Sequence, residues 1–223
     1  MDTPHVNLII ATPGHSVISP YVKCLLATAQ ELNKREITWA WSSEYSSHVA
    51  DAREMTLNGG PENDPSDSRP FKGTLTYDKI LWIDSDIIFT PDDVVKMYES
   101  DKDIVSGAYL LSDGTATAYK ELFGPGFTFE EVKSMTDPVQ IHSAGFGFIC
   151  MKQGIFEKMS RPWFQSVIGT NRYKDENYTF PIMGEDISMC HRIGQMGYEI
   201  WLDPTVRLIH QKTMKLTWEG PMP

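Results

Sequence analysis

Lys79-Ile80-Leu81-Trp82-Ile83-Asp84-Ser85-Asp86 carries a mostly apolar run directly into two aspartates separated by one serine. A short apolar run of this kind is typical of a buried strand. Side chains alternate between the two faces of a strand, so both aspartates project together from its carboxyl end. In open α/β sheets, ligands bind at the carboxyl ends of the strands. Two converging carboxylates repel each other, which favours a divalent metal carrying a diphosphate as their occupant.

The same triplet also has a simpler interpretation, because aspartates often follow strands as turn and capping residues. A helix start is predicted soon afterwards, with Thr90 as N-cap and Pro91 at the first helical position. A strand before the triplet and a helix after it favour the metal site, with Mn²⁺ or Mg²⁺ as the ion. A calcium loop is excluded, since the repeated Asp/Asn spacing with a central Gly and a final Glu is absent.

Composition limits the class of protein. A chain of 223 residues can build a sizeable core, and we expect one domain over residues 1–223. The net charge is −10 and Lys and Arg do not cluster, which argues against nucleic acid as a partner. No apolar run approaches the ~20 residues that span a bilayer, and no signal peptide is visible, so we expect a soluble, cytoplasmic protein. The widely spaced Cys24, Cys150 and Cys190 predict core thiols rather than disulfides or metal ligands.

The first half of the chain predicts strands that alternate with helices. In order, these are a strand at 6–11, a helix from Ser19-Pro20, a strand at 37–41, a helix through 50–57, the strand ending at Ile83, the helix from Pro91 and a strand at 104–105. This alternation is typical of a parallel, doubly wound sheet. Residues 59–73 are rich in Gly, Pro, Asp and Ser and predict a solvated loop.

The second half has a different pattern. It predicts a short edge strand at 116–119, an aromatic loop at 123–129, a strand at 144–151, a helix after Gly184-Glu185-Asp186, and two final strands at 199–202 and 206–209. Gly145 and Gly147 lie inside the 144–151 strand. Glycine at such a position often marks the close approach of a ligand or of another backbone.

Motifs of several common enzyme classes are absent. The sequence has no Gly-X-X-X-X-Gly-Lys loop, no Gly-X-Gly-X-X-Gly turn after the first strand, no His-Glu-X-X-His and no Gly-X-Ser-X-Gly. This argues against P-loop ATPases, Rossmann dehydrogenases, zinc proteases and α/β-hydrolases.

Seven segments resemble, in order, those of nucleotide-sugar glycosyltransferases with the GT-A fold. They are Ile10-Ala11-Thr12-Pro13, Ala50-Asp51-Ala52-Arg53-Glu54, Leu81-Trp82-Ile83-Asp84-Ser85-Asp86, Ile104-Val105-Ser106-Gly107-Ala108-Tyr109, Ser143-Ala144-Gly145-Phe146-Gly147-Phe148, Gly184-Glu185-Asp186-Ile187-Ser188-Met189-Cys190, and Trp201-Leu202-Asp203-Pro204 leading to His210. The compact layout is similar to small family-2-like domains from phages and large algal viruses. The resemblance implies a Rossmann-like, mostly parallel central sheet flanked by helices, with a small mixed second sheet. It also implies a nucleotide-sugar-binding half at 1–110 and an acceptor-binding, catalytic half at 111–223.

The resemblance further implies a hexosyltransferase-like enzyme. It would move a sugar from a nucleoside diphosphate donor, UDP favoured, to a hydroxyl of a glycan, glycoprotein or other acceptor. The metal ligands implied are Asp84, Asp86 and His210, and the nucleotide-binding residues are Thr12, Pro13, Arg53, Asp84 and Ser85. The residues implied at the donor sugar or acceptor are Ala144, Gly145, Phe146, Trp163 and Glu185. Asp186 would be the general base of an inverting reaction.

Each of these residues also has a plainer interpretation. Arg53 either binds phosphate or forms a surface salt bridge, for example with Glu54, which stands where relatives often have Asn. Glu185 and Asp186 fit an ordinary helix N-terminus, where acids face the macrodipole. His210 alone would suggest a partly buried structural residue. A further set of aromatic residues stacks on sugars or packs in the core: Trp163, Phe164 and Tyr173.

Two rival functions stay open at this stage. A sugar nucleotidyltransferase would usually carry a glycine-rich, basic loop after the first strand, and Thr12-Pro13-Gly14-His15 lacks the Arg or Lys expected there. The other rival is a non-catalytic sugar- or nucleotide-binding domain. The acidic triplet, the Glu-Asp helix start and the terminal histidine argue against it.

Overall fold

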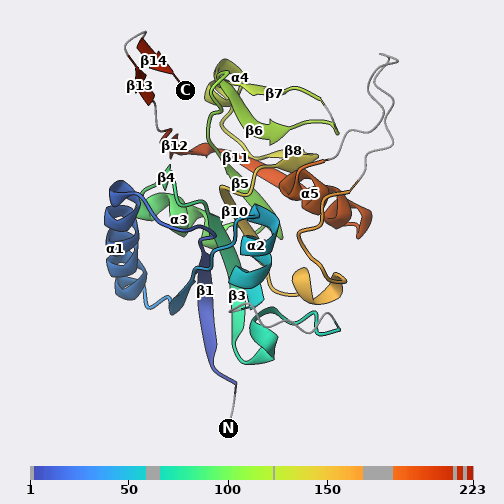
Figure 1. Ribbon diagram of the computed structural model, residues 1–223. Helices are drawn as coiled ribbons and strands as arrows, with labels where there is room; N and C mark the ends of the chain where they lie inside the picture. Colours follow the sequence, from blue (N-terminus) through green and yellow to red (C-terminus); the bar gives the residue numbers. More distant parts are fainter. Residues whose placement is uncertain are drawn as a thin grey trace.

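A seven-stranded sheet forms the centre of the molecule (Figure 1). The computed structural model describes residues 3–58, 66–122, 124–167, 183–212, 215–217 and 220–222. The sheet consists of β1 (His5–Ala11), β2 (Trp39–Ser42), β3 (Thr76–Ile83), β5 (Ile104–Ala108), β8 (Val139–Ile141), β10 (Phe148–Lys152) and β11 (Ile200–Arg207), in the order β2-β1-β3-β10-β5-β11-β8. β10 runs antiparallel to both β3 and β5, and β8 runs antiparallel to β11 at one edge. The other three pairs are parallel, so five of the seven strands run in the same direction, which confirms the mostly parallel sheet predicted from the sequence.

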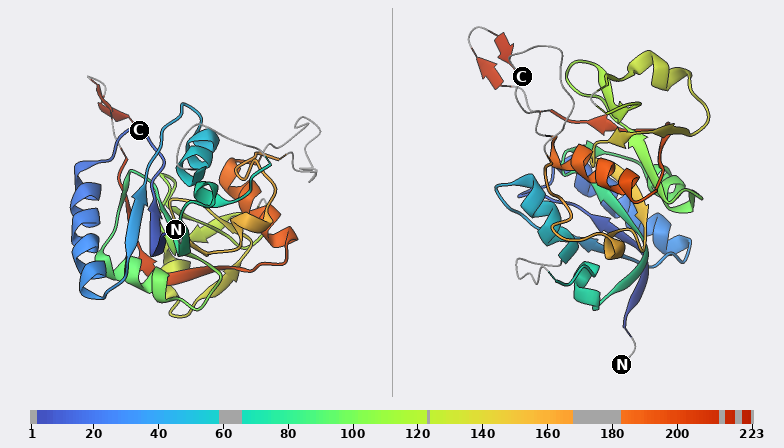
Figure 2. Two further views of the ribbon diagram at one scale, coloured as in Figure 1. Left: turned by 90° about the horizontal axis from the view of Figure 1, so that it is seen from below. Right: turned by 90° about the vertical axis from the view of Figure 1, so that its right-hand side faces the viewer.

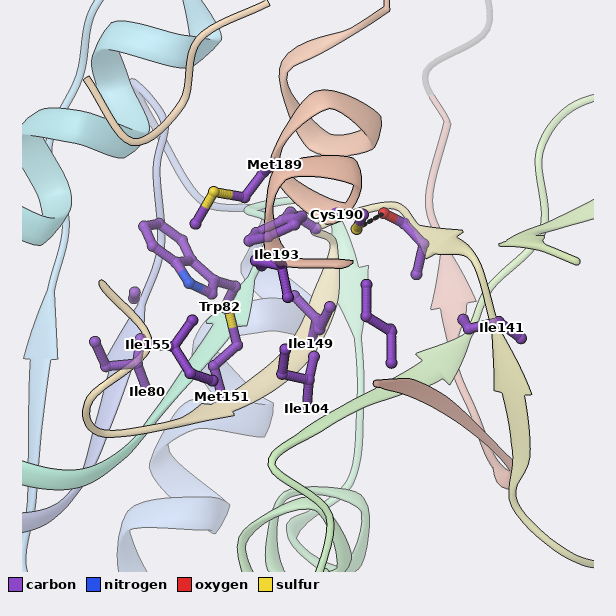
Figure 3. Close-up of a cluster of buried hydrophobic side chains, with 14 of the residues drawn as sticks. Ile80, Trp82, Ile104, Ile141, Ile149, Met151, Ile155, Met189, Cys190 and Ile193 are labelled. Carbon is purple, nitrogen blue, oxygen red and sulfur yellow. Dashed lines mark hydrogen bonds between the residues drawn. The ribbon is translucent and has the colours of Figure 1, made fainter. Parts of the chain in front are cut away.

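Helices cover both faces of this sheet (Figure 2). On one face, α1 (Ser19–Lys34) and α3 (Pro91–Glu99) pack over the side chains of Leu8 and Ile10. On the other face, α2 (Val49–Asn58) and α5 (Glu185–Gln195) pack over a separate cluster that contains Ile9 and Trp82 (Figure 3). Successive β1 residues therefore belong to opposite cores, as the twofold alternation of a strand requires. An apolar run buried on both faces is typical of a parallel strand.

The predicted N-cap at Thr90 is confirmed. Thr90 Oγ1 accepts a hydrogen bond from the Asp93 N–H at 3.3 Å, and Asp93 Oδ2 accepts one from the Thr90 N–H at 2.8 Å. This reciprocal pair is a capping box, which satisfies two otherwise unpaired donors at the helix start. It fixes where α3 begins, only a few residues after the acidic triplet.

The small second sheet differs in detail from the prediction. It contains β6 (Thr115–Tyr119), β7 (Gly126–Thr128) and β9 (Ser143–Ala144) in the order β7-β6-β9, and both pairings are antiparallel, so it is not mixed. β6 is its central strand, so the predicted edge strand is wrong. The predicted loop at 123–129 contains β7 and the start of α4 (Phe129–Ser134). A capping box between Thr128 and Glu131 begins α4, and its Thr-X-X-Glu spacing was visible in the sequence.

Three further predictions of strands need correction. The single strand expected at 144–151 is divided into β9 and β10 by a turn at 145–147. The two strands expected at 199–202 and 206–209 are instead one long strand, β11, followed by β12 (Ile209–His210). β12 pairs with β4 (Ile87–Ile88), a two-residue strand too short for any periodicity to reveal.

The remaining elements are short. They are the 3₁₀ helices η1 (Pro70–Gly73) and η2 (Phe156–Lys158) and the hairpin of β13 (Lys215–Thr217) and β14 (Gly220–Met222). Of the loop predicted at 59–73, residues 59–65 lie outside the described residues, and the part that is described includes η1. None of the helices in the described ranges has the length and apolar character needed to cross a bilayer.

Candidate active site

The acidic turn Asp84-Ser85-Asp86 follows β3 at the carboxyl edge of the sheet, where the sequence predicted it. Its backbone hydrogen bonds include those from Asp84 N–H to Gly147 O (3.0 Å), from Ile87 N–H to Asp84 O (3.1 Å) and from Gln211 N–H to Asp86 O (3.0 Å). The pairing of β4 with β12 aligns Ile87 with His210. This pairing fixes a segment more than 120 residues later in the chain against the turn, and it places His210 next to Asp86.

Asp86 and His210 are in direct contact. His210 Nε2 lies 3.1 Å from Asp86 Oδ2, and His210 Nδ1 lies 3.0 Å from the carbonyl oxygen of Leu110. A carbonyl oxygen can only accept, so Nδ1 carries a proton and donates it to Leu110. In neutral His210, Nε2 then directs a lone pair at a carboxylate oxygen. Two acceptors at this distance repel unless a proton or a metal ion lies between them.

This donor set fits a divalent cation of the Mn²⁺ or Mg²⁺ type. Two ligands at right angles on such an ion, each about 2.1 Å from it, are roughly 3.0 Å apart. The Nδ1–H to carbonyl bond of His210 is the usual partner that orients a metal-binding imidazole. Lys212 Nζ, 3.4 Å from Asp86 Oδ2, also brings positive charge to this carboxylate. This oxygen therefore has a cationic partner, Lys212, besides its contact with His210.

The predicted three-residue metal set is only partly assembled. Within the described ranges, no group of three or more His, Cys, Asp or Glu side chains gathers closely enough to hold a metal. The carboxylate of Asp84 pairs with Arg53. Mg²⁺ commonly takes only one or two protein carboxylates and completes its shell with phosphates and water, so a partial protein set is not unusual for such an ion.

Arg53 lies beneath the acidic groups, not at the surface. Its side chain is 3% exposed, with Nη2 3.1 Å from Asp84 Oδ1 and Nε 3.4 Å from Glu185 Oε1. Its guanidinium carbon lies 5.5 Å from the centre of the Phe146 ring and 5.9 Å from that of Phe164, within reach of cation–π attraction. Nη1 is buried and has no hydrogen-bond partner among the described residues. Arg53 does form salt bridges with nearby acids, but they are Asp84 and Glu185 rather than Glu54, and the predicted surface position is wrong: Arg53 is a buried cation that joins α2, the acidic turn and α5.

The first turn of α5 carries Glu185 and Asp186 beside this cation. No side chain caps the helix at Gly184, and Asp186 Oδ1 accepts a hydrogen bond from the Ile187 N–H at 2.7 Å. Burial, followed by the negative charge of Glu185, raises the pKa of Asp186, while Arg53 opposes the rise. A carboxylate with a raised pKa beside the acidic turn has the chemistry of a general base.

The end of β1 is held by side chains of the protein itself. The Thr12 hydroxyl is buried, pairs with the Tyr21 hydroxyl, and accepts a hydrogen bond from Trp41 Nε1–H at 3.0 Å. Pro13 is also buried, and the Ser85 carbonyl accepts from the Ile18 N–H at 3.2 Å, so the loop after β1 lies against the acidic turn. Thr12 and Pro13 are thus buried residues that support the loop after β1 where it lies against the acidic turn.

Two exposed aromatic residues beside Thr12 were not anticipated from the sequence. Trp41 is 47% exposed at the end of the edge strand β2, and Tyr45 is 52% exposed with its ring 4.8 Å from that of His15. The indole N–H of Trp41 is fixed by Thr12, which holds the ring in one orientation. The alternation in Trp39-Ala40-Trp41 was the only signal in the sequence, and it does not tell which tryptophan faces solvent.

Solved structures with this arrangement of strands include glycosyltransferases. The crystal structure of A197 from STIV matches with a TM-score of 0.56 and 19% identity, covering 96% of this chain and 91% of that one. The catalytic domain of Drosophila β1,4-galactosyltransferase 7, in complex with xylobiose, matches with a TM-score of 0.52 and 10% identity, over 93% of this chain and 71% of that one. A mutant of that enzyme with manganese, UDP-Gal and xylobiose gives 0.51 at 9% identity, with the same coverage. This chain has the GT-A fold.

Identities this low show the fold alone. No family model matches the chain, and no curated protein matches it in sequence. The sheet nevertheless explains why the acidic turn, the first turn of α5 and β12 meet, because each lies at the carboxyl edge of the sheet.

Most side chains predicted to contact sugar are instead inside this GT-A core. Ala144, Phe146 and Trp163 are buried, with Trp163 Nε1–H donating to Phe156 O at 3.0 Å. Phe164 packs edge-on against Trp82, with the ring centres 5.1 Å apart. Core packing, the alternative interpretation of these aromatic residues, is what the structure shows. Gly145 contributes backbone only, and Tyr173 lies outside the described residues.

The unusual Glu54 has a structural partner. Its carboxylate accepts from Arg161 Nη2 at 3.2 Å and from the Phe164 backbone N–H at 2.8 Å, and both charged side chains are almost wholly buried. Glu54 therefore anchors the segment around Phe164 against α2. Its place on α2 next to Arg53 connects that segment with the cation beneath the acidic turn.

Proposed function

We propose that this protein is a metal-dependent glycosyltransferase that moves a sugar from a nucleoside diphosphate donor to an acceptor hydroxyl with inversion. UDP is the favoured nucleotide, and a glycan, glycoprotein or other hydroxyl compound is the acceptor. The observation that carries the proposal is the Asp86–His210 pair at the acidic turn, with His210 Nε2 3.1 Å from Asp86 Oδ2 and His210 Nδ1 3.0 Å from the Leu110 carbonyl oxygen. The manganese and UDP-Gal in the galactosyltransferase of similar fold support the same assignment.

Asp86 and His210 would hold Mn²⁺ or Mg²⁺, with Asp84 toward the ribose or a coordinated water. When bound, the ion supplies Lewis-acid stabilisation of the charge that develops on the leaving diphosphate. Arg53 orients Asp84 from below, because its Nη2 donates to that carboxylate. Trp41 and Tyr45 present exposed aromatic faces on which the base of the nucleotide would stack.

Asp186 would accept the proton of the acceptor hydroxyl as its oxygen attacks the anomeric carbon. Glu185, next to it, would bind the acceptor or position the helix start. The raised pKa of Asp186 makes it a stronger base than an ordinary aspartate. Arg53 contributes here as well, because its positive charge favours ionised Asp186.

A thermal-shift screen with UDP, GDP, CDP and dTDP, each with Mn²⁺ or with EDTA, tests this proposal. A ligand at 100 times its dissociation constant stabilises the native protein by about 2.7 kcal/mol. For a domain of this size, that is an increase in Tm of roughly 5–10 °C. We expect the increase with one nucleotide, UDP first, and only when Mn²⁺ is present. Equal stabilisation in EDTA, or none with any nucleotide, would contradict the proposal.

A product assay separates the two enzyme classes. A glycosyltransferase releases a nucleoside diphosphate from a nucleotide sugar. A sugar nucleotidyltransferase instead releases pyrophosphate from a nucleoside triphosphate and a sugar phosphate. We expect the first product and not the second.

A further inference from the structure

Tyr109 follows β5 and lies behind the acidic turn, at the point where the two sheets meet. It is 6% exposed, and its hydroxyl oxygen accepts a hydrogen bond from the Gly147 N–H at 3.0 Å. Burial and the nearby charge of Asp84 raise the pKa of Tyr109, so the phenol stays protonated. No role was expected for it from the sequence.

The space for this ring comes from two glycines. A Cβ at Gly145 would lie 2.4 Å from the Tyr109 hydroxyl oxygen, and one at Gly147 would lie 2.6 Å from that oxygen and from the ring carbon that carries it. Real Cβ contacts do not become this short, and a buried ring cannot easily move away. Neither glycine has a positive φ, so the need is for space. The two glycines suggested the close approach of a ligand or of another backbone, and the structure instead shows the side chain of Tyr109 there.

Tyr109 and Leu110 together contact both parts of the proposed metal site, the acidic turn and His210. On one side, Gly147 N–H donates to Tyr109, while Gly147 O accepts from the Asp84 N–H at 3.0 Å. On the other side, the Tyr109 ring meets the His210 ring edge-on, with the centres 5.1 Å apart. The carbonyl of Leu110 accepts from His210 Nδ1. One short segment therefore fixes the acidic turn and the imidazole relative to each other.

We infer that Tyr109 is a positioning residue that sets the separation of the acidic turn from His210 and thereby tunes the affinity of this site for a divalent cation. The inference rests on the proposed function for its ligand. Its geometric part, the contact with Gly145 and Gly147, does not depend on any ligand.

The affinity part is tested by titrating the purified protein with Mn²⁺ alone, by calorimetry, well below its Tm. Tyr109→Phe removes only the hydroxyl and should weaken Mn²⁺ binding roughly 10-fold, the lower end of the range for groups that orient metal ligands. Tyr77→Phe is the matched control: Tyr77 is 1% exposed, and its hydroxyl donates to Glu157 Oε1 at 2.9 Å. Tyr77 lies seven residues before Asp84 along the strand, about 23 Å away, so its loss should leave Mn²⁺ affinity unchanged. Equal affinity in Tyr109→Phe and wild type would overturn the inference.

The geometric part is tested by a double-mutant cycle in chemical denaturation. Gly145→Ala should destabilise strongly, since its Cβ meets the Tyr109 hydroxyl. With Tyr109→Phe also present, the nearest atoms left are Thr117 Cβ at 3.2 Å and the ring carbon at 3.3 Å, so much of the loss should be restored. If the losses of stability in the two single variants simply add in the double variant, the contact between Tyr109 and the two glycines is overturned, whatever the protein binds. A different result is a wild-type protein that binds no Mn²⁺ while the double-mutant cycle shows strong coupling. That result would refute the proposed metal-dependent function and the tuning of metal affinity, and Tyr109 would then be a purely structural residue.

Discussion

Replacing Arg53 by Gln removes the buried cation that joins α2, the acidic turn and α5. Its two ion pairs, 3.1 Å to Asp84 and 3.4 Å to Glu185, are charge-assisted hydrogen bonds. Each such bond contributes about 1.5–3 kcal/mol. Both carboxylates are partly exposed, which favours the lower end of that range, so we expect a loss of about 3 kcal/mol in the free energy of unfolding. Urea denaturation at neutral pH measures it.

The same substitution should move the pH dependence of sugar transfer. The charge of Arg53 lowers the pKa of Asp186, so its removal raises that pKa further. A general base must be ionised to act. The acidic limb of the pH–rate profile should therefore shift to higher pH in Arg53→Gln. The profile of kcat at saturating donor and acceptor is the appropriate readout.

Arg35→Gln is the matched control for both measurements. Arg35 is an exposed arginine with two ion pairs of similar length, 2.7 Å to Glu31 and 3.2 Å to Glu99. Exposed pairs contribute about 0.2–1 kcal/mol, so this variant should lose little stability and keep the wild-type profile. If Arg53→Gln loses no more stability than Arg35→Gln, or keeps the wild-type profile, the reasoning about the buried cation is wrong.

Two further predictions concern the base and the nucleotide. Asp186→Asn should keep donor affinity and lose transfer by roughly 10²–10⁴-fold. Because the folded state raises the pKa of Asp186, the stability linked to this group is present below its unfolded pKa and lost as pH rises through the folded pKa, so Asn should stabilise the protein at pH values above the folded pKa. Near wild-type transfer would remove Asp186 as the base, and a loss of stability would contradict its raised pKa. Trp41→Ala should weaken UDP binding by at least about fivefold, since stacking on a base contributes about 1–3 kcal/mol. Trp201→Ala, at a ring paired with Lys102 away from the acidic turn, should leave UDP binding unchanged, and equal affinities in both variants would refute stacking on Trp41.

The local elements of this fold could be predicted because their signals are local. The run ending at Ile83 is apolar on both faces, and the Thr90–Asp93 spacing caps α3, so each appears in a few consecutive residues. The pairing of β4 with β12 joins segments more than 120 residues apart through two residues each. No periodicity can reveal a strand of that length, although it is this strand that brings His210 to Asp86.

The orientation of side chains was the other feature that could not be predicted from the sequence. Phe146 and Trp163 are aromatic residues next to polar or glycine-rich segments, which suits a sugar platform and a core equally well. Only the tertiary packing decides between these two interpretations, and it buries the side chains of both residues. For the same reason Arg53 could be identified as part of the site but not as a buried cation, since its depth depends on the rings that three other segments bring around it.

The most direct test of metal-dependent sugar transfer is the release of UDP from UDP-sugars, UDP-Gal among them, with Mn²⁺ or with EDTA. Wild type should release UDP with Mn²⁺ and not with EDTA. Asp86→Ala should fold and release none, while Asp78→Ala, at an exposed aspartate near the opposite end of β3, should behave as wild type. Equal release in EDTA, equal release by Asp86→Ala, or no release from any donor with Mn²⁺ would contradict the account.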